Sequence, residues 1–232
     1  QAKAQGAHNQ LVASAKVVRS ARQISKSIKV GMMLAYQPIY AYTCDPDDQL
    51  QAKLSEQTTL FYSDVQMGGF YPASRLKKYN REGIILEDTP EDYDLLRSAD
   101  FLGFSCYGSS TITTHKDILE KSGGNLMMGV QNPYLETNAW GWATDPNCLR
   151  IALNVLYDRY HKPLWIVENG IGWDDKIESD GSIHDNYRID YLRQNISSMF
   201  DAINNDGIEL MGYTMWGCID LVSAGTGEMK KR

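Results

Sequence analysis

The chain has 232 residues, of which 43% are hydrophobic, and a formal net charge of −6 at pH 7. This length and composition predict one globular domain, or two small ones, with a sizeable core. The acidic balance argues against a general nucleic-acid or membrane-surface binder, and no apolar run is long enough to cross a bilayer.

Cysteine and histidine usage points to no metal site and no cofactor. No two cysteines form a CxxC pair, and the four histidines lack ligand spacing. Because the cysteines have apolar or aromatic neighbours, we expect reduced, buried thiols, and with no signal peptide we expect a cytoplasmic location. The cysteines are Cys44, Cys106, Cys148 and Cys218.

Apolar periodicity predicts helices that alternate with short strands. The Asp45-Pro46 and Asp145-Pro146 pairs are typical helix starts, with aspartate as the cap and proline in the first turn. The expected helices cover residues 1–28, 47–65, 74–81, a short segment from Pro90, 146–160, and a segment from Asn186. The expected strands cover residues 29–34, 101–107, 164–167 and 209–216, and residues 108–144 are expected to form a long loop.

The helix that starts at Asn186 has an apolar stripe at helical spacing, which we expect to face the core. That stripe consists of Ile189, Leu192, Ile196, Met199 and Ile203.

The segment that organises the chain is the apolar run from Leu164 to Val167, which leads directly into Glu168. We expect a strand that is buried on both faces and ends at Glu168, where Asn169-Gly170 turns the chain into a loop. A carboxylate at the carboxyl end of a buried strand is typical of barrel enzymes, although a capping or salt-bridged glutamate fits the same pattern.

The order of the elements predicts a parallel sheet. An open doubly wound sheet is one possibility, but no glycine-rich phosphate loop follows any strand. Four strands fit half of an eight-stranded barrel better. Because a free-standing half would leave two apolar strand edges unpaired, we expect the other half of the barrel upstream of Gln1.

Five segments, in register over nearly the whole chain, resemble motifs of the family 1 glycoside hydrolases. Ile166-Val-Glu168-Asn169-Gly170 resembles the nucleophile motif of that family. The other four segments are residues 8–15, 101–107, 187–192 and 215–220. The resemblance implies a (β/α)8 TIM barrel, an α/β fold, of which residues 1–232 form the C-terminal half of a single domain with strands five to eight.

The same resemblance implies retaining glycoside hydrolysis, which uses two carboxylates about 5–5.5 Å apart. It implies that Glu168 is the nucleophile, that Tyr107 hydrogen-bonds and orients it, and that Trp216 forms the floor under the sugar. Trp142 either lines the leaving-group side or belongs to the core. Because the general acid/base of the family precedes Gln1, we expect the chain alone to be inactive.

The last loop departs from ordinary β-glucosidases, in which Glu and Trp hold the free sugar hydroxyls. Here Ser223 and Ala224 occupy those positions. Serine removes a charge that would repel a phosphate at O6, and Lys231 follows nearby as a cation. The segment is similar to the 6-phospho-β-glucosidase branch, although a solvated Gly/Ser loop with a basic end fits it too.

We therefore expect a 6-phospho-β-glucosidase whose partners are a phosphorylated β-glucoside and the other half of the barrel. A 6-phospho-β-galactosidase, a plain β-glucosidase and a non-catalytic sugar-phosphate-binding relative are the alternatives. Ala224 favours the gluco reading, because the galactosidase branch has tryptophan there. The sequence leaves the oligomeric state open, a homo-oligomer included.

Overall fold

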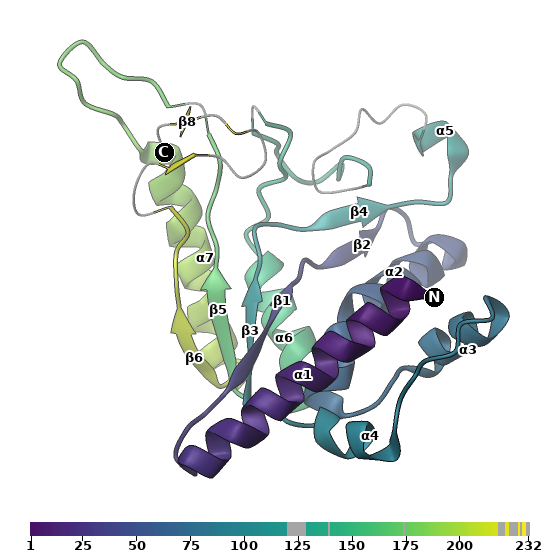
Figure 1. Cartoon of the computed structure of the whole chain (residues 1–232). Coiled ribbons are helices and arrows are strands. Elements are labelled where there is room, and N and C mark those ends of the chain that lie inside the picture. The colour runs from purple at the N-terminus through teal and green to yellow at the C-terminus, as the bar shows by residue number, and fades with distance from the viewer. Residues whose placement is uncertain are drawn as a thin grey trace.

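The computed structural model describes residues 1–119, 129–138, 140–173, 175–217, 221–222, 227 and 229–230 (Figure 1). The helices are α1 (Ala2–Ile24), α2 (Pro46–Ser63), α3 (Ala73–Arg81), α4 (Pro90–Leu96), α5 (Lys116–Leu119), α6 (Cys148–Tyr160) and α7 (Asn186–Asn204). A π-helical turn, η1 (Asp64–Gly68), continues α2. The strands are β1 (Gly31–Ala35), β2 (Ile39–Ala41), β3 (Phe101–Ser105), β4 (Ser110–Ile112), β5 (Leu164–Glu168), β6 (Leu210–Tyr213), β7 (Leu221–Val222) and β8 (Met229–Lys230).

The main sheet has four strands in the order β1-β3-β5-β6, and all three neighbouring pairs are parallel. The alternation of strands and helices had predicted this arrangement, which is that of a partial (β/α)8 barrel. Parallel strands place their carboxyl ends at one edge, at the top of Figure 1. Within the described residues, β1 and β6 each pair with a single strand, so neither outer edge of the sheet has a partner there.

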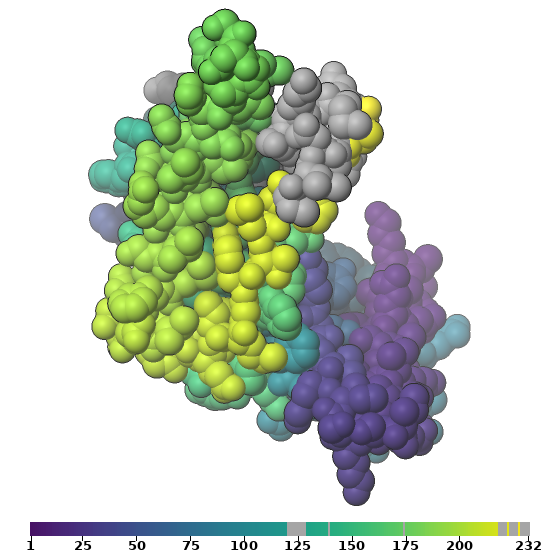
Figure 2. All heavy atoms as spheres, turned by 90° about the vertical axis from the view of Figure 1, so that its left-hand side faces the viewer, coloured from purple at the N-terminus to yellow at the C-terminus, as the bar shows by residue number. Residues whose placement is uncertain are grey.

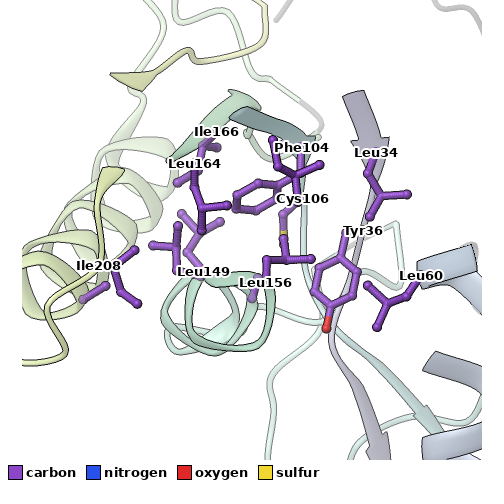
Figure 3. Packing of buried hydrophobic residues seen from close by; sticks show 14 of the residues in the cluster. Leu34, Tyr36, Leu60, Phe104, Cys106, Leu149, Leu156, Leu164, Ile166 and Ile208 are labelled. Carbon is purple, nitrogen blue, oxygen red and sulfur yellow. The ribbon is translucent and has the colours of Figure 1, made fainter. Parts of the chain in front are cut away.

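The core lies between this sheet and α6. Phe104 of β3, Leu164 and Ile166 of β5, and Leu149 and Leu156 of α6 are all fully buried, and Figure 3 shows them packed together. Burial of such side chains contributes about 1.5–3 kcal/mol each. Leu164 and Ile166 therefore fix the strand that carries Glu168 to the main hydrophobic core.

The opposite face of the sheet is only partly covered, so the expected burial of β5 on both faces is wrong. Trp165, which alternates with Leu164 and Ile166, is half-buried, and Met33 of β1 is 50% exposed. Figure 2 views the sheet from its β6 edge and shows the yellow segment that includes β6 at the surface. The physical reason is that this face is the interior of a barrel, and four strands do not enclose it.

Helix α7 also differs from its predicted orientation. Ile189, Ile196 and Ile203 are 44–54% exposed, whereas Met199 is buried as expected. The buried face of α7 instead carries smaller or polar side chains, namely Tyr191, Asn195, Ser198 and Ala202. Small residues let α7 approach α6 closely, and the Ser198 hydroxyl accepts a hydrogen bond from the Arg150 N–H at 3.2 Å.

Helix boundaries follow the predicted caps in part. Asp45 caps α2 by accepting the N–H of Asp47 at 3.0 Å, with Pro46 at the first helical position. Helix α1 ends at Ile24 rather than residue 28, because Ser25 is extended. Helix α6 begins at Cys148, not at the Asp145-Pro146 pair.

The expected long loop over residues 108–144 contains regular structure. Strand β4 pairs with β2 in a small parallel sheet above the main one. Asp48 of α2 is fully buried beneath it, where it accepts hydrogen bonds from Thr43, Thr113 and Thr114. Burial raises the pKa of Asp48, but these hydrogen bonds outweigh it and leave the pKa well below its usual range.

Two further findings concern thiols and membranes. Cys106 and Cys148 are buried as expected, but Cys44 is exposed because it lies on the loop that precedes α2. Cys218 lies outside the described residues. Among the helices that the structure describes, none is long and apolar enough to span a membrane.

Candidate functional site

The carboxyl ends of three neighbouring strands bring Tyr107, Glu168 and Trp216 to one edge of the sheet. Glu168 is the last residue of β5, and the other two follow β3 and β6. The backbone pairing continues past the strands, since Cys106 N–H donates to the Glu168 carbonyl at 3.0 Å and Trp216 N–H donates to the Asn169 carbonyl at 2.8 Å. The backbone thereby fixes the three segments relative to one another.

Tyr107 and Glu168 are in direct contact. The phenol O–H donates to Oε2 of the carboxylate at 3.0 Å, and both side chains are half-buried. A phenol donor stabilises an ionised carboxylate and restricts its rotation. The two residues are 61 positions apart in the chain, so this contact depends on the parallel register of β3 and β5.

A cleft with aromatic walls lies beside this pair. Tyr107, Trp142 and Trp216 line it together with Trp140 and Tyr191. The rings of Tyr107 and Trp142 meet edge to face, with centroids 6.3 Å apart. Trp216 is 44% exposed, so its ring offers an apolar surface of the kind that the C–H face of a sugar can contact. Among the described lining residues there is no carboxylate.

The rim of the cleft consists of two interlocked loops. The side chain of Asn138 accepts the N–H groups of Trp140 and Trp142 at 2.9 and 3.0 Å, and it donates to the Gly172 carbonyl at 2.8 Å. The ring of Trp140 lies so close to Gly172 that a Cβ there would come within 1.9 Å of it. Only glycine fits at this contact.

The loop between β5 and α7 packs against the start of α7. The rings of Trp173 and Tyr187 stack with centroids 4.5 Å apart. Arg188, which also lines the cleft, pairs with Asp175, whose side chain is 2% exposed, at 3.4 Å. Burial, followed by the hydrogen bond to Asp175, raises the pKa of Tyr187, so its hydroxyl stays protonated at neutral pH.

Asn169 is a polar residue of the site that the sequence did not single out. It follows Glu168, is fully buried, and contacts Cys106, Tyr191 and Tyr213. The Asn-Gly pair predicts only a turn, and nothing in the sequence links it to tyrosines 22 and 44 residues away.

Two predicted substrate-binding residues, Ser223 and Lys231, lie outside the described residues. Within the described part of the chain, no group of three or more His, Cys, Asp or Glu side chains is arranged to hold a metal ion.

A carboxylate at a strand end, beside an aromatic cleft on a partial barrel, is an arrangement typical of enzymes. Comparison with known proteins identifies the family to which the chain belongs. The model of the family described as glycosyl hydrolase family 1 matches residues 1–232. The chain therefore belongs to glycosyl hydrolase family 1.

Individual relatives agree with this assignment. The chain is similar to aryl-phospho-beta-D-glucosidase BglH of Bacillus subtilis (strain 168), with 50% identity over 230 residues, which are 98% of this chain and 49% of the relative. It is 46% identical over 233 residues to 6-phospho-beta-glucosidase AscB of Escherichia coli (strain K12), which covers 100% of this chain and 49% of that relative. The solved family 1 b-glucosidase from Thermotoga maritima superposes with a TM-score of 0.82 at 25% identity, over 97% of this chain and 49% of that one. The chain spans about half the length of the curated relatives it matches.

Proposed function

We propose that the chain forms half of the barrel of a retaining 6-phospho-β-glucosidase, which hydrolyses β-glucosides that carry a phosphate on O6. The observation that carries this proposal is the Tyr107–Glu168 hydrogen bond of 3.0 Å beside the aromatic cleft. The names of BglH and AscB, two relatives at 46–50% identity, support the phosphorylated substrate. The products are glucose 6-phosphate and the released aglycone.

In the proposed reaction the Glu168 carboxylate attacks the anomeric carbon, and the bond between that carbon and the aglycone oxygen breaks. The leaving oxygen takes a proton from a second carboxylic acid about 5–5.5 Å away. Water, deprotonated by that same second group, then displaces Glu168 from the glycosyl-enzyme ester. The second carboxylate comes from the complementary half of the barrel.

Two aromatic residues serve this reaction in different ways. Tyr107 keeps Glu168 ionised and aimed at the sugar by donating its hydrogen bond. Trp216 supplies the apolar floor under the sugar ring. Trp142 lies on the leaving-group side, where its ring also packs edge to face against that of Tyr107.

Recognition of the phosphate determines which substrate the enzyme accepts. Ser223, in place of a glutamate, leaves no negative charge beside O6, and Lys231 supplies a cation. Because sugar phosphates do not cross membranes unaided, we place this enzyme in the cytoplasm.

The proposal is tested with a chimaera in which residues 1–232 replace the matching half of BglH. The substrates are p-nitrophenyl β-glucoside, its 6-phosphate and the corresponding β-galactoside 6-phosphate. We expect the glucoside 6-phosphate to have the highest kcat/KM, and the chain alone to give no turnover. Preferred cleavage of the unphosphorylated glucoside would point to a plain β-glucosidase, and preferred cleavage of the galactoside to a 6-phospho-β-galactosidase.

A binding measurement separates an enzyme from a non-catalytic relative. If the chimaera binds the glucoside 6-phosphate but never releases p-nitrophenol, the catalytic proposal is wrong. The phosphate contact is tested by Lys231→Ala, which we expect to raise KM for the phosphorylated substrate only. Lys176→Ala is the matched control, since Lys176 is 81% exposed and pairs only locally with Glu178.

A further inference from the structure

We propose that Asn169 is the positioning residue of the site: its buried side-chain amide locks the strand ends that carry Tyr107, Glu168 and Trp216 into one arrangement. This inference rests on the proposed function for its kinetic part, whereas its structural part depends only on the contacts of Asn169.

Every polar atom of the Asn169 side chain has a partner. Its Nδ2 donates to the Cys106 carbonyl at 2.8 Å and to the Tyr191 hydroxyl at 2.9 Å, and its Oδ1 accepts from the Tyr213 hydroxyl at 2.9 Å. The amide can take only one orientation, because a carbonyl oxygen accepts hydrogen bonds and cannot face Oδ1 favourably. Three elements, β3, α7 and β6, are thus tied to the residue that follows the nucleophile.

The network reaches each of the three site residues. Tyr191 donates its hydroxyl to the Tyr107 carbonyl at 3.3 Å, which links Asn169 to Tyr107 through one further residue. The backbone carbonyl of Asn169 accepts the N–H of Trp216 at 2.8 Å. Glu168 is its neighbour in the chain. A displacement of Asn169 therefore moves the nucleophile, its phenol donor and the sugar floor together.

Burial restricts the side chains of this network to one arrangement. Asn169 is fully buried and Tyr191 is 4% exposed. Burial raises the pKa of both tyrosines, that of Tyr213 to about 12, so both hydroxyls remain protonated donors. Because a buried polar group that loses its partner is destabilised, alternative arrangements of these side chains are disfavoured.

The test uses Asn169→Asp, which keeps the size of the side chain but removes both donors. Asn195→Asp is the matched control: Asn195 is 1% exposed, also lies near Tyr191, and likewise donates its Nδ2 to a backbone carbonyl, that of Tyr191, at 2.8 Å. Both variants place a carboxylate against a buried carbonyl, but only Asn169 touches the strand ends.

In the BglH chimaera we expect both variants to lower the melting temperature, but only Asn169→Asp to lower kcat per active site. The expected loss is about 100-fold with little change in KM, because misplacement of reacting groups by about 1 Å has an effect of that size. Active sites are counted with a 2-deoxy-2-fluoro-β-glucoside 6-phosphate that traps the glycosyl-enzyme. Equal kcat per titrated site in the two variants would overturn the proposal.

Uncharged variants and a structural measurement complete the test. Tyr213→Phe removes one hydrogen bond of the network, that to Asn169, whereas Tyr191→Phe removes two, those to Asn169 and to the Tyr107 carbonyl. We expect both variants to lose less kcat than Asn169→Asp does, and wild-type kcat in both would contradict the network. In the same chimaera, Asn169→Asp should speed amide exchange at Cys106 and Trp216, whereas Asn195→Asp should not. If the wild-type chimaera prefers an unphosphorylated glucoside, the proposed substrate class is wrong. The comparison of kcat per active site between Asn169→Asp and Asn195→Asp on that glucoside then still tests the role of Asn169.

Discussion

Replacement of Tyr107 by phenylalanine tests the contact on which the proposed function depends. The substitution removes one oxygen and its 3.0 Å hydrogen bond to Glu168. It keeps the ring that meets Trp142 edge to face, so the wall of the cleft is preserved. The variant therefore isolates the effect of the donor on the carboxylate.

The size of the effect follows from the charge on the acceptor. A hydrogen bond to a charged group contributes about 1.5–3 kcal/mol. If that stabilisation orients Glu168 for attack, its loss lowers kcat/KM by roughly 10- to 150-fold, since 1.36 kcal/mol corresponds to a factor of ten. We expect most of the loss in kcat, because the phenol contacts Glu168, the proposed nucleophile, rather than the aglycone.

The assay is hydrolysis of p-nitrophenyl β-glucoside 6-phosphate by the BglH chimaera. Tyr134→Phe is the control, because Tyr134 is 90% exposed and should behave as wild type. A Tyr107→Phe variant with wild-type kcat/KM and an unchanged melting temperature would refute the reasoning. An equal rise in KM at constant kcat would also refute it, since that result would assign the phenol to ground-state binding.

Three further predictions concern Glu168 and two ion pairs. Glu168→Gln should lower turnover of the chimaera by several orders of magnitude, measured as release of p-nitrophenol. Arg159→Met should lower the free energy of unfolding of the chain by about 3–5 kcal/mol in urea, because it removes the guanidinium that binds the buried carboxylate of Asp64 at 2.6 and 2.8 Å and leaves that carboxylate with the Tyr160 hydroxyl at 2.9 Å. Hydrogen bonds from Arg150 and then Asn154 lower the pKa of Asp206 to about 2; its stabilisation is therefore complete above the unfolded value of about 3.9 and lost as pH falls towards 2, so the difference in urea midpoint between wild type and Asp206→Asn should vanish over that range.

The sheet and the position of Glu168 at its carboxyl-terminal edge were predictable because their signals are local. The apolar run before Glu168 defines a strand, and the Asp45-Pro46 pair defines a helix start, without reference to distant residues. Parallel order then places Glu168 and Tyr107 at the same edge.

What the sequence could not show depends on long-range packing. The spacing of Ile189, Ile196 and Ile203 marks an apolar stripe correctly, but periodicity does not say which stripe meets a neighbour, and close approach to α6 selected the side with Ser198 and Ala202. The Asn169 network was likewise hidden, since its partners come from strands and a helix far along the chain.

The interlocked rim has a consequence for the thermodynamics of ligand binding. Asn138 and the contact of Trp140 with Gly172 join the two rim loops into one body. Because the rim loops are already ordered, they lose little conformational entropy when a sugar binds in the cleft. More of the contact energy therefore appears as affinity. Disrupting the joint, for example by Gly172→Ala, should therefore weaken binding with a less favourable entropy, in addition to any ligand contact that a displaced Trp140 loses.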